Sequence, residues 1–200
     1  MNENRFSMAG WASIVASVVF PLAFIIDGIH QEVLECSGAE FTVGIGPADP
    51  LFLLFAALSI YVLKAFKTLL YEYYSFREIG TIISVAIFWH IVFFGGSFLL
   101  ELMYGTVWPQ GHVGLPLALV VFYVTGIAVF GIIDIIIGII LLRQKRRFSL
   151  PIRAFAWLSI AMGFFEATVV LSFLALLLVP VSLIALAFVF LRRVDEVEFV

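Results

Sequence analysis

Charged residues are scarce in this chain: only 12% of its 200 residues are Asp, Glu, Lys or Arg. Hydrophobic residues make up 64% and the mean hydropathy is +1.17, whereas soluble domains are roughly 45–50% apolar. So few polar groups cannot cover a surface that faces water, which excludes an ordinary soluble protein. We therefore predict an integral membrane protein whose apolar surface faces the lipid bilayer.

Cysteine is nearly absent as well. Cys36 is the single one, which excludes an internal disulfide, a CxxC redox pair and an all-thiolate metal site. The chain also has no Gly-x-Ser-x-Gly, HExxH or P-loop motif, so the common hydrolase and nucleotide-binding classes find no support. Because only His90 lies deep within an apolar segment, a haem held between two histidines is not expected. We predict no cofactor and no nucleic-acid partner.

The apolar segments predict an all-α fold, a polytopic bundle of six transmembrane helices that forms a single domain over residues 1–200. The last apolar stretch, 152–191, covers about 40 residues, twice what one crossing needs at 1.5 Å per residue. We therefore divide it near Ser172. The predicted spans are residues 8–29, 51–71, 79–103, 114–142, 152–171 and 173–191.

Lysine and arginine are missing from two of the predicted loops, residues 29–50 and 104–113. Cytoplasmic loops retain positive charge and translocated loops lose it. With six spans every basic residue is on the cytoplasmic side, so we predict that both termini are cytoplasmic. We expect the membrane to be the cytoplasmic membrane of a prokaryote. Five spans would place the final pair of arginines outside. The basic residues are Arg5, Lys64, Lys67, Arg77, Arg143, Lys145, Arg146, Arg147, Arg153, Arg192 and Arg193.

Three ionisable residues fall near the middle of predicted spans. At 1.5 Å per residue, Asp134 lies ~13 Å, His90 ~19 Å and Glu166 ~20 Å from the cytoplasmic boundary of a ~30 Å hydrocarbon layer. A charge at that depth costs about 2.5–3.5 kcal/mol on insertion scales. We therefore expect the three side chains to point into the bundle or into a wet cavity.

Glycines accompany both mid-membrane acids. Gly131, Asp134 and Gly138 share one face of the fourth span, with Tyr123 on the same face three turns earlier. The fifth span repeats the pattern, so that "GIID" is matched by the "GFFE" that ends at Glu166. Since small residues let helices approach closely, these faces are expected to meet other helices.

Two readings remain open for Asp134. Lys64 lies at a depth of ~12 Å on the second span and could form an ion pair with it if the two helices are neighbours. An acid without such a partner would be stabilised in its neutral form by desolvation and could exchange protons. On the third span, His90, Ser97 and Glu101 form a polar stripe that leads from mid-membrane to the outer surface.

The outer face is acidic and carries no basic residue, so it should attract cations. Asp27 and His30 are one helical turn apart and could share a metal ion with His112 or Glu101. The spacing matches no compact metal motif, and solvated acidic loops are the simpler reading of the same residues.

Three functions fit these observations. The first is a small transporter or transport component, in which protonation of Asp134 or Glu166 is coupled to movement of a small solute or cation. Nearly level with it is a non-catalytic membrane partner, such as an assembly factor, anchor or regulatory subunit. A metal-dependent membrane enzyme at the outer face is third. Because 200 residues are few for a complete carrier, we expect a homo-oligomer or a complex with another membrane protein.

Overall fold

The computed structural model describes residues 6–36, 45–107, 114–144, 148–168 and 171–191. Each of the six helices within these ranges is long and apolar enough to cross a membrane, which confirms the predicted all-helical class with six potential spans. The helices are α1 (Ser7–Cys36), α2 (Asp49–Tyr74), α3 (Gly80–Val107), α4 (Gly114–Arg143), α5 (Leu150–Ala167) and α6 (Ser172–Leu191).

Two helices differ most from the predicted spans. α1 continues to Cys36 instead of stopping at residue 29, because the polar segment after residue 29 contains no glycine or proline and hydropathy marks the apolar part of a helix only. α5 ends at Ala167 instead of residue 171. There the sequence continues with Thr168 and two valines, β-branched residues of low helix propensity.

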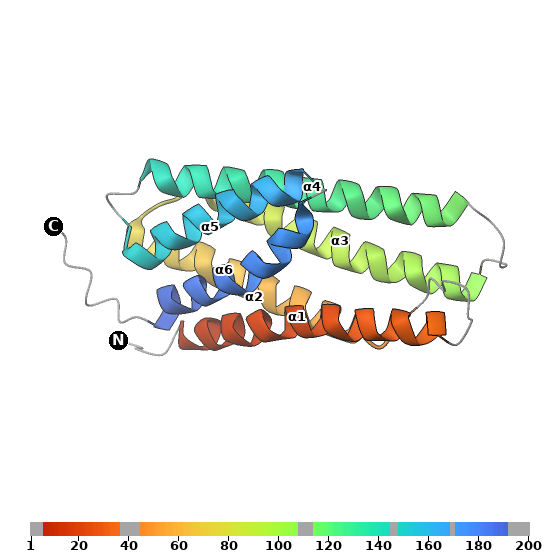
Figure 1. Cartoon of the computed structure of the whole chain (residues 1–200). Helices are drawn as coiled ribbons and strands as arrows, with labels where there is room; N and C mark the ends of the chain where they lie inside the picture. Colours follow the sequence, from red (N-terminus) through yellow and green to blue (C-terminus); the bar gives the residue numbers. More distant parts are fainter. Residues whose placement is uncertain (1–5, 37–44, 108–113, 145–147, 169–170, 192–200) are drawn as a thin grey trace.

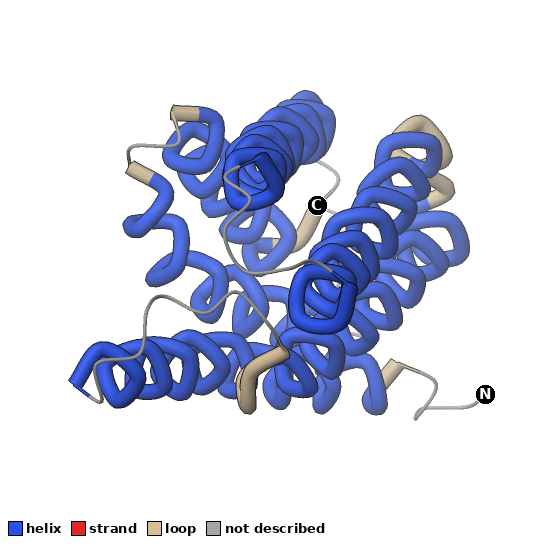
Figure 2. The backbone as a smooth tube through the Cα atoms, turned by 90° about the vertical axis from the view of Figure 1, so that its right-hand side faces the viewer, coloured by secondary structure: helices blue, strands red, loops and turns tan. Residues whose placement is uncertain are grey.

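The six helices form a ring in chain order. Extensive contacts join each helix to the next one in the sequence, and α1 packs against α6 to close the ring. At this closure the Ser13 hydroxyl donates a hydrogen bond of 2.6 Å to the carbonyl oxygen of Leu183. Figure 2 shows the helices from one end of the bundle, arranged around a common centre.

The two ends of the bundle differ in charge. α1 begins and α6 ends at the same end (Figure 1), which also holds the connections from α2 to α3 and from α4 to α5, with Arg77, Arg143 and Arg153. We call it the basic end. The opposite end, with the connections from α1 to α2 and from α3 to α4, is called the acidic end.

The main hydrophobic core lies toward the basic end. Large side chains from α2, α3, α4 and α5 are almost completely buried there and pack together, and the ring of Phe66 meets that of Phe155 edge to face at 5.4 Å. The outward faces are apolar too, as expected for contact with lipid: Trp11, Phe88 and Trp157 are each more than 60% exposed. The most deeply buried core residues include Phe66, Leu70, Ile79, Ile83, Leu141 and Ile152.

The turn between α5 and α6 lies beside the middle of α4 (Figure 1). A Cβ atom placed on Gly131, near the midpoint of α4, would lie 2.5 Å from the backbone nitrogen of Ala167, the last residue of α5. α1 and α4 thus extend beyond this turn toward the acidic end. The basic half of the ring has six helical walls, whereas the acidic half lacks α5 and most of α6.

Candidate functional site

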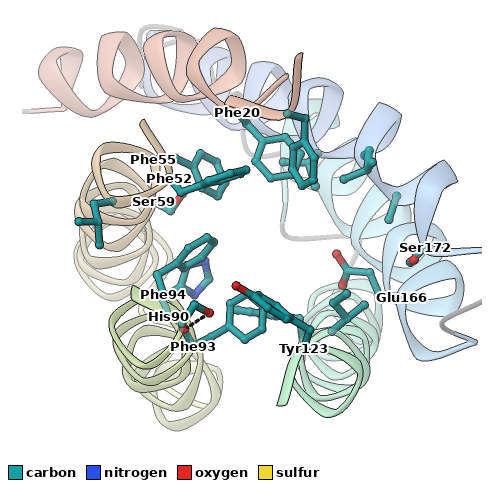
Figure 3. Close-up of a pocket in the computed structure, with 18 of the residues that line it drawn as sticks. Phe20, Phe52, Phe55, Ser59, His90, Phe93, Phe94, Tyr123, Glu166 and Ser172 are labelled. Carbon is teal, nitrogen blue, oxygen red and sulfur yellow. Dashed lines mark hydrogen bonds between the residues drawn. The ribbon is translucent and has the colours of Figure 1, made fainter. Parts of the chain in front are cut away.

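One large cavity occupies the centre of the ring. It has a volume of about 770 Å³, within the ~300–1,000 Å³ range of typical ligand sites, and side chains from all six helices line it. Figure 3 shows aromatic and polar side chains from opposite walls pointing into this space. We call it the central cavity.

The central cavity is closed toward the basic end and open toward the acidic end. Its deepest lining residues, such as Val62 and Leu186, belong to the buried core that fills the basic half. Its other boundary includes exposed side chains of α1, α4 and α6, among them Phe24, Val120 and Phe173, which are 39%, 56% and 59% exposed. Among the described residues, the cavity is therefore bounded by the buried core toward the basic end and reaches exposed side chains in the acidic half.

The wall of the cavity is largely aromatic. Phenylalanines from all six helices contribute, together with Tyr123 and His90. The chain contains 22 phenylalanines in all, and a large share of them faces inward at this site instead of facing lipid. The phenylalanines of the wall are Phe20, Phe24, Phe52, Phe55, Phe93, Phe94, Phe98, Phe130, Phe155 and Phe173.

Glycines bring the two mid-membrane acids together. A Cβ atom on Gly131 would lie 2.6 Å from the carbonyl oxygen of Gly163 and 3.0 Å from the Cβ atom of Glu166, distances that no larger residue tolerates. Gly138 meets the backbone of α5 in the same way, at 2.6 Å from the Ala156 oxygen. The glycine faces predicted from "GIID" and "GFFE" are thus the surfaces on which α4 and α5 cross.

Asp134 and Glu166 both line the central cavity, and their carboxyl groups are close enough to interact electrostatically. The Oε2 atom of Glu166 is buried and has no hydrogen-bond partner among the described residues. Figure 3 shows this carboxyl group directed into the cavity. The sequence predicted the depth of each acid, and the structure adds that they form a pair.

Lys64 lies on the exposed outer surface of α2 and does not line the cavity. Its helix is not among those that pack extensively against α4, and within the described part of the chain no ion pair joins Lys64 to Asp134. Of the two readings left open for Asp134, the structure therefore favours the acid without a lysine partner. Equal predicted depth does not fix the direction in which a side chain points.

His90 faces the cavity from α3 (Figure 3). Its Nδ1 atom lies 2.8 Å from the carbonyl oxygen of Ala86; since that oxygen can only accept, Nδ1 donates, and in a neutral imidazole Nε2 is left as an acceptor. The ring packs edge to face against Phe130 with centroids 4.8 Å apart. The expected inward direction of His90 is what the geometry shows.

The polar stripe of α3 continues toward the acidic end. The Tyr123 hydroxyl of α4 donates a hydrogen bond to the carboxylate of Glu101, which also interacts electrostatically with Asp49 and Asp27. Ser97 instead donates within its own helix, to the carbonyl oxygen of Phe93 at 2.7 Å. The cavity thus runs from an acidic mouth to the pair of acids near the middle of the bundle.

The proposed metal ligands are only partly described. Asp27 and His30 both line the mouth of the cavity, whereas His112 lies outside the described residues. Among the residues that are described, no three His, Cys, Asp or Glu side chains converge as a metal site would require. The set of ligands with Glu101 is therefore not formed, whereas the set with His112 remains a prediction from sequence.

Two features of the cavity escape prediction from sequence. Ser59 of α2 is only 5% exposed and its Oγ atom, on the cavity wall, has no hydrogen-bond partner within the described ranges. A serine in an apolar helix is common, so nothing in the sequence singles it out. The aromatic wall could not be predicted either: the sequence shows that phenylalanine is abundant, but it does not show that these side chains gather around one cavity.

Comparison with protein-family models, curated proteins and solved structures finds no match to this chain.

Proposed function

We propose that the protein is a small membrane transporter, or the membrane-spanning component of one, and that its solute binds in the central cavity. One observation carries the proposal: a single cavity is lined both by acids of the acidic end and by Asp134 and Glu166, which lie about two thirds of the way along α4 and at the end of α5. Ionisable residues within membrane spans are rare and mark solute paths or proton relays by default. A purely structural pair of acids would not need a solute-sized space beside it.

In the proposed cycle the structure corresponds to the state that is open at the acidic end. If the basic end is cytoplasmic, as the charge distribution favours, solute enters from outside a prokaryotic cytoplasmic membrane. Release to the other side requires the buried core at the basic end to open. The close glycine crossing of α4 and α5 supports such a movement, because smooth helix surfaces can slide or rock as rigid bodies.

Asp134 and Glu166 would couple solute to protons. Two carboxyl groups that share an apolar site cannot both be charged at low cost, because each is desolvated and each repels the other. A proton bound to the pair removes this cost, and so does a bound positive charge. Proton and solute can then exchange at one place, which is the requirement for coupled transport.

Transport can be tested with purified protein in liposomes that carry an imposed pH gradient and an internal pH dye. A panel of three solutes, an organic cation, an organic anion and a neutral sugar, is added in turn. We expect one of them to change the rate at which the gradient collapses. The variants Glu166→Gln and Asp134→Asn should lower this solute-dependent rate by at least roughly tenfold, a barrier change of about 1.4 kcal/mol.

The matched control is Glu78→Gln, the same substitution at an exposed acid between α2 and α3, which should leave the rate unchanged. Unchanged solute-dependent proton flux in both cavity variants would refute the role of the pair. If no solute moves protons while another membrane protein co-purifies in mild detergent, the alternative function as a non-catalytic partner would replace this proposal.

A further inference from the structure

We infer that the central cavity binds an amphipathic organic amine, with its protonated nitrogen between Asp134 and Glu166 and its apolar body against the phenylalanines. The inference deepens the proposed function by naming the class of solute. Binding itself can be measured without transport, so the two can fail separately.

Charge is the first argument. Among the described residues, five carboxyl groups line the cavity and no lysine or arginine does, so this wall favours a cation over an anion. α6 contributes no titratable side chain to the wall. The titratable groups that face the cavity are Asp27 and His30 from α1, Asp49 from α2, His90 and Glu101 from α3, Tyr123 and Asp134 from α4, and Glu166 from α5.

Hydrogen bonding is the second argument. Deep in the cavity, Glu166 Oε2 and Ser59 Oγ are buried without partners among the described residues, and His90 Nε2 is left as an acceptor. Buried polar groups in native proteins are nearly always paired, and an unpaired one costs about 1–3 kcal/mol. A carboxylate and an imidazole nitrogen both accept, so the missing partner is a donor. An ammonium group bound at Glu166 supplies the N–H donor that its Oε2 atom lacks among the described residues.

The aromatic wall is the third argument. The faces of phenylalanine rings carry negative potential and attract cations, and Phe94 and Phe130 lie beside His90, with ring centroids 6.0 Å and 4.8 Å away. A small hydrated metal ion would gain little from a wall of this kind or from a volume of about 770 Å³. An organic cation with an apolar body fills such a space.

Charge balance then sets the stoichiometry. When the acid pair holds a proton, the entering ammonium ion replaces it at the carboxylate, and one proton leaves for each amine that binds. The total charge inside the cavity is the same before and after. Binding should therefore acidify a lightly buffered solution.

Three probes that share one phenylbutyl skeleton test the inference: 4-phenylbutylamine as a cation, N-(4-phenylbutyl)acetamide as a neutral compound, and 5-phenylpentanoate as an anion. Each is titrated into purified protein in detergent by calorimetry, and a pH indicator records proton release. We expect the amine to bind at least roughly tenfold more tightly than the other two, with about one proton released per amine bound.

Variants separate charge from shape. Glu166→Gln and Asp134→Asn should each weaken amine binding by roughly tenfold and leave amide binding unchanged. Phe130→Leu should weaken amine binding by roughly two- to fivefold, the value of one cation–π contact. Glu78→Gln, at an exposed acid outside the cavity, should have no effect.

Equal binding of the three probes, or amine binding without proton release, would overturn the inference on the unmodified protein, even if a variant fails to fold. The transport proposal has its own outcome. Amine binding without any movement of amine across liposomes would refute transport and leave the ligand class standing. Proton-coupled movement of the sugar or the anion would support transport and refute the amine as the ligand class.

Discussion

Tyr123 and Glu101 join α4 to α3 at the acidic end through a hydrogen bond between their side chains. Both residues line the central cavity. The bond holds the hydroxyl and the carboxylate in fixed positions at the mouth, where either could otherwise turn toward water. At the scale of single residues, this contact joins two walls of the cavity through polar side chains.

We predict that Tyr123→Phe lowers stability by about 1 kcal/mol, because the Glu101 carboxylate loses its donor while the ring volume is conserved. The measurement is thermal unfolding in detergent. Tyr61→Phe is the control, since Tyr61 is 41% exposed on the lipid-facing side of α2. An equal shift for the two variants would contradict the prediction.

The sequence predicted the ionisable residues of the site better than their partners. Helical rise gives the depth of a residue, and the glycines beside Asp134 and Glu166 gave the direction of both side chains. The neighbour of Asp134 could not be predicted in this way, because hydropathy does not reveal which helices pack together. The alternative that paired Asp134 with Lys64 failed for that reason. No sequence pattern marked Ser59 as a residue of the cavity.

At the scale of helices, the crossing of α4 and α5 decides the geometry of the acid pair. Gly131, Gly138 and Gly163 let the two backbones touch, and Asp134 lies between the two glycines of its own helix. A wider spacing of the helices would separate the carboxyl groups. The glycines therefore act on the site as well as on the fold.

We predict that Gly131→Ala destabilises the protein by about 1–3 kcal/mol, the usual cost of overpacking, because its Cβ atom would lie 2.5 Å from backbone that cannot move away. Gly95→Ala in α3 is the matched control, since a Cβ atom there has no neighbour within 4 Å, and alanine should be neutral or slightly stabilising. Thermal unfolding of both variants checks the difference. Similar behaviour of the two would argue against the close crossing.

At the scale of the whole molecule, the bundle is solid at one end and hollow at the other. Six apolar helices could be predicted from hydropathy and length alone, since each needs only its own sequence. The cavity could not be predicted in this way, because it arises from the order of the helices in the ring and from the end of α5 at Ala167, before the predicted residue 171. Those features depend on packing between segments far apart in the chain.

Accessibility to a membrane-impermeant thiol reagent tests the hollow end. In a Cys36→Ser background, Ser59→Cys should react, because this position lines the cavity. Ser159→Cys should stay unreactive: Ser159 is equally buried, with 0% exposure, but lies outside the cavity wall. Labelling is read by mass spectrometry on protein in sealed vesicles. Reaction at both positions, or at neither, would contradict a cavity open at the acidic end.

The order of the ring also has a consequence for biogenesis. Each helix from α2 to α6 packs extensively against the one synthesised just before it, so most of the bundle can assemble progressively while the chain is still being inserted. Only the contact between α1 and α6, with its hydrogen bond across 170 positions from Ser13 to Leu183, must wait for the last helix. Closing so long a loop costs entropy, and until it happens the chain is an open arc in which the acids of the central cavity lack their closing wall.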